Sequence, residues 1–315
     1  MIRSGREVLI VLMPSIQTQV RGAVLALALA AFVGGGAAQD RDVSLAGAID
    51  FHVHSGPDSR PRSVTDLEVA RMAQRAGPRG IVLKNHFTMT ADRAALAMAQ
   101  VDGVEIFGAV VLNRAVGGLN AEAVRQMVQF DGGRGKVVWL PTFDAEYYVT
   151  AQGESGPFVS VTHEGVPVPE LAGIFALVAE HDLVLAMGHS SPEEVLVLIP
   201  EARRHGVEQI LVTHVFSQRP SRAQMQQMAD AGAILEIDWY AVYLGNQTVA
   251  AYVSAIQEIG AEHFLMSSDL GQATSPSHVD GLRAYVMAFR NAGLTDEQID
   301  LMLRRNPARL LGLEP

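Results

Sequence analysis

Two histidines separated by one residue are the side chains of this sequence best suited to chemistry. His52 and His54 end an apolar run that breaks at Gly56-Pro57. In a β-strand, residues two apart point to the same face, so the two imidazoles would project together. Neutral imidazole is a common protein ligand for divalent metals, which makes this pair a candidate metal site. The alternative is two exposed or hydrogen-bonded histidines where a strand meets a loop.

Further polar side chains end later apolar runs in the same way. Lys84 and His86 share a face at the end of the second run, and His189, His214 and Asp269 end the fifth, sixth and eighth runs. A lone histidine at the end of a strand is usually structural. Polar residues at the ends of several strands instead indicate one shared site. The sequence therefore predicts that these side chains meet the first two histidines at a metal site.

Eight short apolar segments are expected to be the strands that position these residues. Most are continuously apolar, as is typical of parallel strands buried on both faces. The predicted strands are Ala48–Val53, Gly80–Asn85, Val104–Leu112, Lys136–Thr142, Leu183–Gly188, Gln209–Thr213, Ala233–Ile237 and His263–Ser268. Helix signals lie between them, including a capping box from Thr65 to Glu68 and an N-cap at Ser191 followed by Pro192. This alternation predicts an α/β fold, a (β/α)8 TIM barrel with its site at the C-terminal ends of the strands.

One insertion interrupts the alternation after the fourth strand. Residues 144–169 are rich in glycine and proline, and within them Phe158–Thr162 and Val166–Val168 are predicted to form a small hairpin. Long loops at this end of a barrel often form lids or substrate walls. A solvated excursion without a role is the alternative.

The complete pattern of candidate ligands resembles that of the amidohydrolase superfamily of metal-dependent hydrolases. The shared features are His-x-His on strand one, histidines on strands five and six, and an aspartate on strand eight. The resemblance extends over nearly all of residues 39–315 and includes Asn306–Leu313, which is similar to the helix-ending segment of these enzymes. Lys84-Asn85-His86 on strand two resembles an uncharacterised branch of the superfamily.

The resemblance implies roles for these residues. It implies that His52, His54 and Asp269 hold a first divalent ion, and that Asp269 takes a proton from the attacking water. His189 and His214 would hold a second ion or, in single-metal members, supply one ligand and one group that stabilises the transition state, so that His214 is also a catalytic candidate. Zinc is the expected ion, with manganese, iron and nickel as alternatives.

The ligand that would bridge two ions departs from the family pattern. Binuclear members take a carboxylated lysine or a glutamate from strand four, but Val137–Asp144 has neither at its end. Lys84 could supply a carboxylated lysine from strand two. It could instead be an uncarboxylated cation for a substrate carboxylate or oxyanion, or a paired structural lysine. Asp144 could also be a ligand, so one or two ions are compatible with the sequence.

Several polar residues near the predicted strand ends are candidates for binding the substrate. His86, Asp144, Arg219 and Tyr240 are the first choices, with a role of His86 in orienting a ligand as the alternative. Asp58, Arg60 and Arg62 on the first loop could also bind an anionic substrate, although solvated loop charges are the simpler interpretation.

The predicted reaction is attack of water on an amide, cyclic amide, ester or lactone of a small substrate. A single-metal decarboxylase or other carbon–carbon lyase is one alternative, because the bridging residue on strand four is missing. Phosphoester hydrolysis is another, and a non-catalytic binding protein would leave the order of the ligands unexplained. The fold alone does not choose among them.

The composition limits the partners and the compartment. The 315 residues contain no cysteine and carry a formal net charge of −10, which excludes thiol chemistry and disfavours binding to nucleic acid. Arg21 and the apolar run 23–33 precede small residues, so residues 1–38 are predicted to be a signal peptide, with Met13 as an alternative start. Residues 39–315 would then be a single barrel domain exported to a bacterial periplasm, without stable membrane association and compatible with a homo-oligomer. An uncleaved anchor is the alternative.

Overall fold

The computed structural model of the protein describes residues 43–314, so the predicted signal peptide lies outside the described residues. Eight parallel strands form one sheet in the order β1-β2-β3-β4-β7-β8-β9-β10. Their bounds are β1 Ile49–His54, β2 Gly80–Lys84, β3 Glu105–Val111, β4 Gly135–Trp139, β7 Val184–Ala186, β8 Gln209–Val212, β9 Ile234–Asp238 and β10 Phe264–Ser267. All eight predicted strands are present, with ends that differ by at most three residues. The prediction of a (β/α)8 barrel is confirmed.

Main-chain contacts join the first strand to the segment after the last. The amide of His54 donates to the carbonyl of Leu270 at 2.9 Å, and the amide of Asp269 donates to the carbonyl of His52 at 3.0 Å. Val53 and Leu270 form a parallel bridge at the same place. The barrel is therefore nearly closed, and its seam lies beside the candidate ligands.

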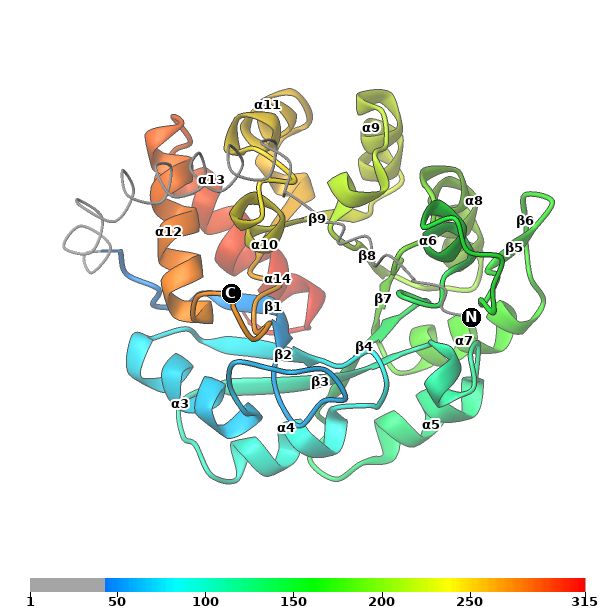
Figure 1. Ribbon diagram of the computed structural model, residues 1–315, viewed down its shortest axis with the longest axis horizontal. Coiled ribbons are helices and arrows are strands. Elements are labelled where there is room, and N and C mark those ends of the chain that lie inside the picture. The colour runs from blue at the N-terminus through cyan, green and yellow to red at the C-terminus, as the bar shows by residue number, and fades with distance from the viewer. Residues whose placement is uncertain (1–42, 315) are drawn as a thin grey trace, which may run out of the picture. The chain divides into compact units, whose positions relative to one another are not determined.

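Helices surround the strands (Figure 1). Their bounds are α3 Asp66–Ala76, α4 Ala91–Met98, α5 Ala121–Gln129, α6 Glu146–Ala151, α7 Glu170–Glu180, α8 Pro192–Arg204, α9 Arg222–Asp230, α10 Trp239–Tyr243, α11 Val249–Ile259, α12 His278–Asn291, α13 Asp296–Asp300 and α14 Asn306–Leu310. Both predicted helix starts are present, because Thr65 with Glu68 and Ser191 with Glu194 form capping boxes. No helix within residues 43–314 is long and apolar enough to cross a membrane.

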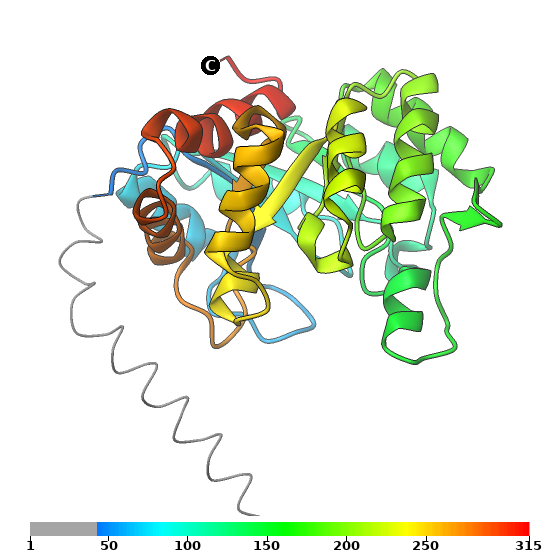
Figure 2. The same ribbon diagram turned by 90° about the horizontal axis from the view of Figure 1, so that it is seen from above.

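Two layers of apolar side chains hold the barrel together. The interior layer includes Phe51, Trp139 and Leu211, and Leu310 of α14 packs against it. The outer layer includes Val53 and places the strands against α3 and α4. Figure 2 shows the C-terminal helices, in red, at the end of the barrel opposite to the loops that follow β1 and β10.

The predicted hairpin after β4 is present but shorter than expected. Its strands are β5 Thr162–His163 and β6 Val166–Pro167, which pair antiparallel. The first strand thus begins four residues later than predicted. Upstream of it, Val159 instead hydrogen-bonds through its main chain to Asp144 and Glu146, which ties that part of the insertion to the start of α6.

Candidate metal centre

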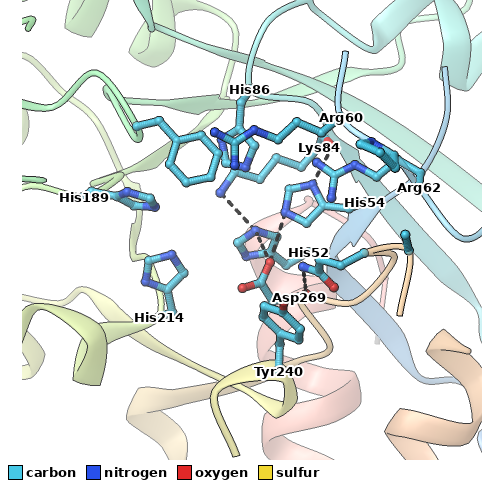
Figure 3. A pocket seen from close by; sticks show the side chains of 14 residues that line it. His52, His54, Arg60, Arg62, Lys84, His86, His189, His214, Tyr240 and Asp269 are labelled. Atoms are coloured by element: carbon cyan, nitrogen blue, oxygen red, sulfur yellow. Dashed lines mark hydrogen bonds and ion pairs between the residues drawn. The ribbon is translucent and has the colours of Figure 1, made fainter. Parts of the chain in front are cut away.

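A cavity of about 440 Å³ opens at the C-terminal ends of the strands. Its lining comes from β1 and β2, from the loops after β1, β2, β4, β7, β8 and β10, and from α10. The lining residues are His52, His54, Arg60, Pro61, Arg62, Lys84, His86, Phe143, His189, His214, Tyr240, Asp269, Gln272 and Ala273. Figure 3 shows that side chains predicted from five different strand ends converge here.

The two histidines of β1 are fixed in one tautomer by their neighbours. Nδ1 of His52 lies 3.0 Å from Oε1 of Glu236, and Nδ1 of His54 lies 3.1 Å from the main-chain oxygen of Lys84. Because a carboxylate and a carbonyl accept hydrogen bonds, both Nδ1 atoms carry the proton. Burial lowers the pKa of both imidazoles well below the usual value, so both are neutral. Each Nε2 therefore presents a lone pair to the cavity.

Asp269 faces these two lone pairs. Its Oδ1 lies 3.1 Å from Nε2 of His52 and 3.0 Å from Nε2 of His54. The residue has a φ of +49°, a left-handed conformation that non-glycine residues rarely adopt, and this turn directs the carboxylate inward. Burial raises the pKa of Asp269 to about 7, against the opposing effect of the nearby Lys84 charge.

These three residues fit a divalent cation. One ligand atom from each of His52, His54 and Asp269 lies within 4.8 Å of the others. Two imidazole lone pairs beside a carboxylate oxygen repel one another unless a cation or proton lies between them. Ligand atoms in a tetrahedral zinc site lie about 3.3 Å apart, as metal–nitrogen distances of about 2.0–2.1 Å require, which is close to the separations observed here. The hydrogen bonds to both Nδ1 atoms are those that orient metal-binding histidines.

Lys84 lies at the centre of the site. Its Nζ is 2.9 Å from Nε2 of His52 and 4.8 Å from the centroid of the Trp139 ring. Burial lowers the pKa of Lys84 to about 8, partly offset by the charges of Asp269 and Glu236. A substantial fraction of neutral amine near pH 8 is what carboxylation by carbon dioxide requires.

His189 and His214 lie across the cavity from the first pair. Their ring centroids are 4.8 Å apart, and Nδ1 of each is buried without a hydrogen-bond partner among the described residues. His214 has a φ of +26°, and its amide donates to Oε2 of Glu236 at 2.9 Å. Burial lowers the pKa of His189 well below its usual value and that of His214 to about 4. Both rings are therefore neutral and able to act as ligands or hydrogen-bonding groups.

His86 lines the cavity and is held from behind. Its Nδ1 lies 2.9 Å from the hydroxyl of Thr142, and its ring centroid is 4.1 Å from that of Phe143. Asn113 donates to both the main-chain oxygen of His86 and the hydroxyl of Thr142. This buried network fixes the ring with one edge toward the cavity.

The remaining candidates for substrate binding divide into two groups. Tyr240 lines the cavity, as do Arg60 and Arg62, which were predicted less strongly. Asp144 and Arg219 are not among the lining residues. The Asp144 carboxylate accepts a hydrogen bond from the amide of Arg114 at 2.9 Å, and Arg219 ends a short 3-10 turn in a left-handed conformation. Both residues shape loops around the site.

Glu236 is a further candidate site residue, which was not predicted from the sequence. It is fully buried on β9 and accepts hydrogen bonds from His52, His214 and the hydroxyl of Ser267 at 2.8–3.0 Å. The sequence does contain a signal, because the acids Glu236 and Asp238 lie two residues apart in an otherwise apolar strand. Because side chains alternate between the two faces of a β-strand, Glu236 shares the interior face of β9 with Ile234 and Asp238.

Two sequence families match parts of the chain. One is described as a family of unknown function (DUF6282) and matches residues 47–236. The other is the phosphotriesterase family, which matches residues 187–311. No curated protein matches the chain.

Several solved structures share the barrel fold. A protein described as a probable 2-pyrone-4,6-dicarboxylic acid hydrolase from Acinetobacter baumannii, with citric acid bound, has a TM-score of 0.58 at 14% identity, covering 85% of this chain and 100% of its own. A protein of similar description from Pseudomonas putida has a TM-score of 0.59 at 17% identity over 87% and 100%. The organophosphorus hydrolase from Deinococcus radiodurans has a TM-score of 0.57 at 16% identity over 85% and 93%.

Proposed function

The chain belongs to the family of unknown function DUF6282, and the prediction of an enzyme of the amidohydrolase superfamily is confirmed. On this basis we propose that the protein uses a divalent metal to hydrolyse small carbonyl compounds. The bond cleaved would be that of an ester, lactone, amide or cyclic amide. The matches support a metal-dependent hydrolase, and the choice of bond is our proposal.

One observation carries this proposal. Oδ1 of Asp269 lies within 3.1 Å of Nε2 of both His52 and His54, and all three residues line the cavity. Such a set of two neutral imidazoles and one carboxylate suits zinc, with manganese, iron or nickel as alternatives. A bound divalent ion supplies Lewis acidity, which makes a water nucleophilic near neutral pH and polarises the substrate carbonyl.

The residues of the chain then have separate tasks. The water oxygen would bond to the carbonyl carbon, and its proton would pass to the carboxylate of Asp269, which lies beside Nε2 of His52 and of His54. Asp269 returns the proton to the leaving oxygen or nitrogen as the bond from the carbonyl carbon to that atom breaks. His214 faces the developing oxyanion from the other side of the cavity as a neutral imidazole, and Glu236 holds its main chain in place.

The number of ions depends on Lys84. If Lys84 stays an amine, its ammonium form binds the substrate oxyanion or a carboxylate, and the site holds one ion. If it is carboxylated, it would supply a further ligand. The Nδ1 atoms of His189 and His214, which have no hydrogen-bond partner among the described residues, would then support a second ion. Metal analysis of protein prepared with and without bicarbonate distinguishes the two states, because only the carboxylated form would gain a second ion with bicarbonate.

The proposal is tested by metal content, stability and turnover together. Purified protein should contain at least one divalent ion per chain, chelation should lower its melting temperature, and zinc or manganese should restore it. The metal-loaded protein should then cleave members of a panel of simple lactones, esters and amides. A protein without metal, and without a gain in melting temperature on adding either ion, would contradict the proposal.

Phosphoester hydrolysis is the second candidate, and the phosphotriesterase match over residues 187–311 favours it. The same ion and the same acceptor for the water proton would serve attack at phosphorus. Turnover of a phosphotriester faster than that of any lactone or ester would support this candidate. Release of carbon dioxide from an unsaturated acid, without ester cleavage, would instead indicate the lyase reaction.

A further inference from the structure

Two arginines of the first loop bring unused hydrogen-bond donors to the cavity. Arg60 and Arg62 both line it, and both side chains extend toward the candidate metal ligands (Figure 3). Among the described residues, Arg62 pairs through Nε only, and Arg60 pairs with no carboxylate. The terminal nitrogens of both guanidinium groups are therefore available to a ligand.

A buried aspartate positions this pair. Oδ2 of Asp58 accepts a hydrogen bond from Nε of Arg62 at 2.7 Å, and Oδ1 accepts one from the amide of Arg60 at 3.1 Å. The Asp58 carboxylate is fully buried and the Arg62 side chain is only 6% exposed. Holding Nε in this way leaves the two terminal nitrogens of Arg62 directed outward from the ion pair.

The main chain of the same loop is anchored to the loop that carries Asp269. Arg62 pairs with Gln272, and the amide of Ser63 donates to the carbonyl of Gly271 at 3.0 Å. These contacts tie the two loops to each other. A group bound by the arginines would consequently keep a fixed distance from the candidate metal ligands.

Arg60 reaches across the cavity toward the β4 side. Its guanidinium carbon lies 4.1 Å from the centroid of the Phe143 ring, within the range of a cation–π contact. Phe143 in turn packs against His86. Stacking holds the guanidinium plane without using its N–H donors, which remain free for a planar anion.

The net charge of Arg60, Arg62 and Asp58 taken together matches a monoanion. Arg60 and Arg62 contribute two positive charges, and Asp58 neutralises one of them. The remaining single charge matches a carboxylate better than the two charges of a phosphate monoester.

We propose that Arg60 and Arg62 form a carboxylate clamp, so that the substrate carries a carboxylate group apart from the bond that is cleaved. This inference rests on the proposed hydrolase function and names its substrate class: small carboxylated esters, lactones or amides. A guanidinium pair is suited to this task, since each fork can bind both oxygens of a carboxylate. The clamp orients the scissile carbonyl toward His52, His54 and Asp269.

Two matched esters test the clamp by turnover. Mono-4-nitrophenyl glutarate ends in a carboxylate, and its methyl ester has the same length and leaving group without the charge. We expect the metal-loaded protein to have a higher kcat/KM for the acid. Arg60→Ala and Arg62→Ala should each lower the ratio of acid to methyl ester by roughly tenfold or more, as expected for loss of a charge-assisted hydrogen bond. Arg62→Lys should keep part of the ratio.

Arg71→Ala is the matched control, because Arg71 lies exposed on α3 and outside the cavity. This variant should keep the wild-type ratio. Metal content and melting temperature, measured for every variant, separate loss of the clamp from loss of the ion or of the fold. If the protein cleaves both esters but the Arg60 and Arg62 variants keep the wild-type ratio of kcat/KM for the acid to that for the methyl ester, the proposal of a clamp is wrong.

Binding measurements separate failure of the clamp from failure of the proposed function. Calorimetry with glutarate, its dimethyl ester and inorganic phosphate needs no turnover. Preferential binding of glutarate that is lost in both arginine variants would support the clamp, even if neither ester were cleaved. Equal binding of glutarate and its dimethyl ester, or tighter binding of phosphate, would overturn the assignment to a carboxylate.

Discussion

At the scale of single residues, Glu236 connects three parts of the site. It fixes the tautomer of His52, accepts the main-chain amide of His214, and binds the hydroxyl of Ser267 beside the barrel seam. A carboxylate that hydrogen-bonds a metal-binding histidine increases the basicity of that ligand. Glu236 would therefore act on a bound ion through His52, which makes it a candidate positioning residue.

Glu236→Gln should weaken metal binding while leaving the barrel folded. Glutamine keeps the shape and one acceptor oxygen, but it removes the charge that strengthens the His52 ligand. We expect a loss of roughly 10–100-fold in zinc affinity, the usual effect of removing such a partner. Competition with a chromogenic chelator measures this change.

Glu180→Gln is the control for this substitution, since Glu180 is exposed at the end of α7. Zinc affinity in the control should equal that of the wild type. If Glu236→Gln binds zinc as tightly as the control does, Glu236 does not support the metal site.

A second residue-scale prediction concerns His278 and pH. His278 is buried, its Nε2 lies 2.9 Å from the carbonyl oxygen of Leu270, and burial lowers its pKa to about 4. Below pH 6.5, His278 binds a proton in the unfolded chain but stays neutral in the folded protein. This residue therefore lowers the free energy of unfolding as the pH decreases from 6.5 to about 4. Below pH 4 both states are protonated and its contribution becomes constant.

His278→Gln removes this proton linkage but keeps an N–H donor for Leu270. The loss of unfolding free energy between pH 7.5 and pH 5 should be smaller in the variant by roughly 2 kcal/mol, which is one proton over 1.5 pH units. Urea unfolding of the chelated protein at both pH values measures it. An unchanged pH dependence would show that His278 can be protonated in the folded state.

Site residues could be predicted from the sequence where a polar side chain stands out from an apolar run. His189, His214 and Asp269 each end an apolar run, so both their strand and their direction followed from the sequence. Arg60 and Arg62 lie in an irregular loop, where no period fixes the direction of a side chain. Their approach to the cavity depends on the Asp58 ion pair and on pairing with Gln272, which are tertiary contacts.

At the scale of elements, the turn after β10 is the most constrained part of the site. Asp269 has a φ of +49° and Gly271 a φ of +114°. A Cβ on Gly271 would lie 1.7 Å from the carbonyl oxygen of His54. The close approach of this turn to β1 therefore requires glycine both for its conformation and for space.

Gly271→Ala should destabilise the fold and displace Asp269. We expect a loss of roughly 3 kcal/mol or more, from the left-handed backbone together with overpacking against β1. Gly245→Ala is the matched control, because Gly245 has a φ of +74° but nothing within 4 Å of the added Cβ. It should cost only about 1–2 kcal/mol and keep zinc affinity. Equal losses in both variants, measured by urea unfolding, would contradict the close approach.

At the scale of the whole molecule, the sequence predicts the barrel better than it predicts the closure of the barrel. Eight apolar runs with intervening helix signals are local patterns, and each formed where expected. Closure depends on the segment after β10, where Leu270 accepts the amide of His54 outside any regular strand. The late start of the hairpin has a similar cause, since Val159 pairs with Asp144 and Glu146 across the insertion.

The location of the ligands makes metal binding a property of the whole barrel. His52 and His54 belong to the first strand, and Asp269 follows the last. A bound ion thus joins the two ends of the sheet at its seam. It should stabilise the folded state by about 2.7 kcal/mol at a free concentration of one hundred times its Kd.

Hydrogen exchange should detect this effect at the seam. The amides of His54 and Asp269 bond across the seam, whereas the amide of Leu140 bonds to Ala186 between β4 and β7 at 2.8 Å. Removing the ion with a chelator should accelerate exchange of the two seam amides by roughly tenfold or more, since local opening there no longer breaks metal bonds. Leu140 should change less. Equal acceleration at all three amides would mean that the ion stabilises the barrel as a whole without closing the seam.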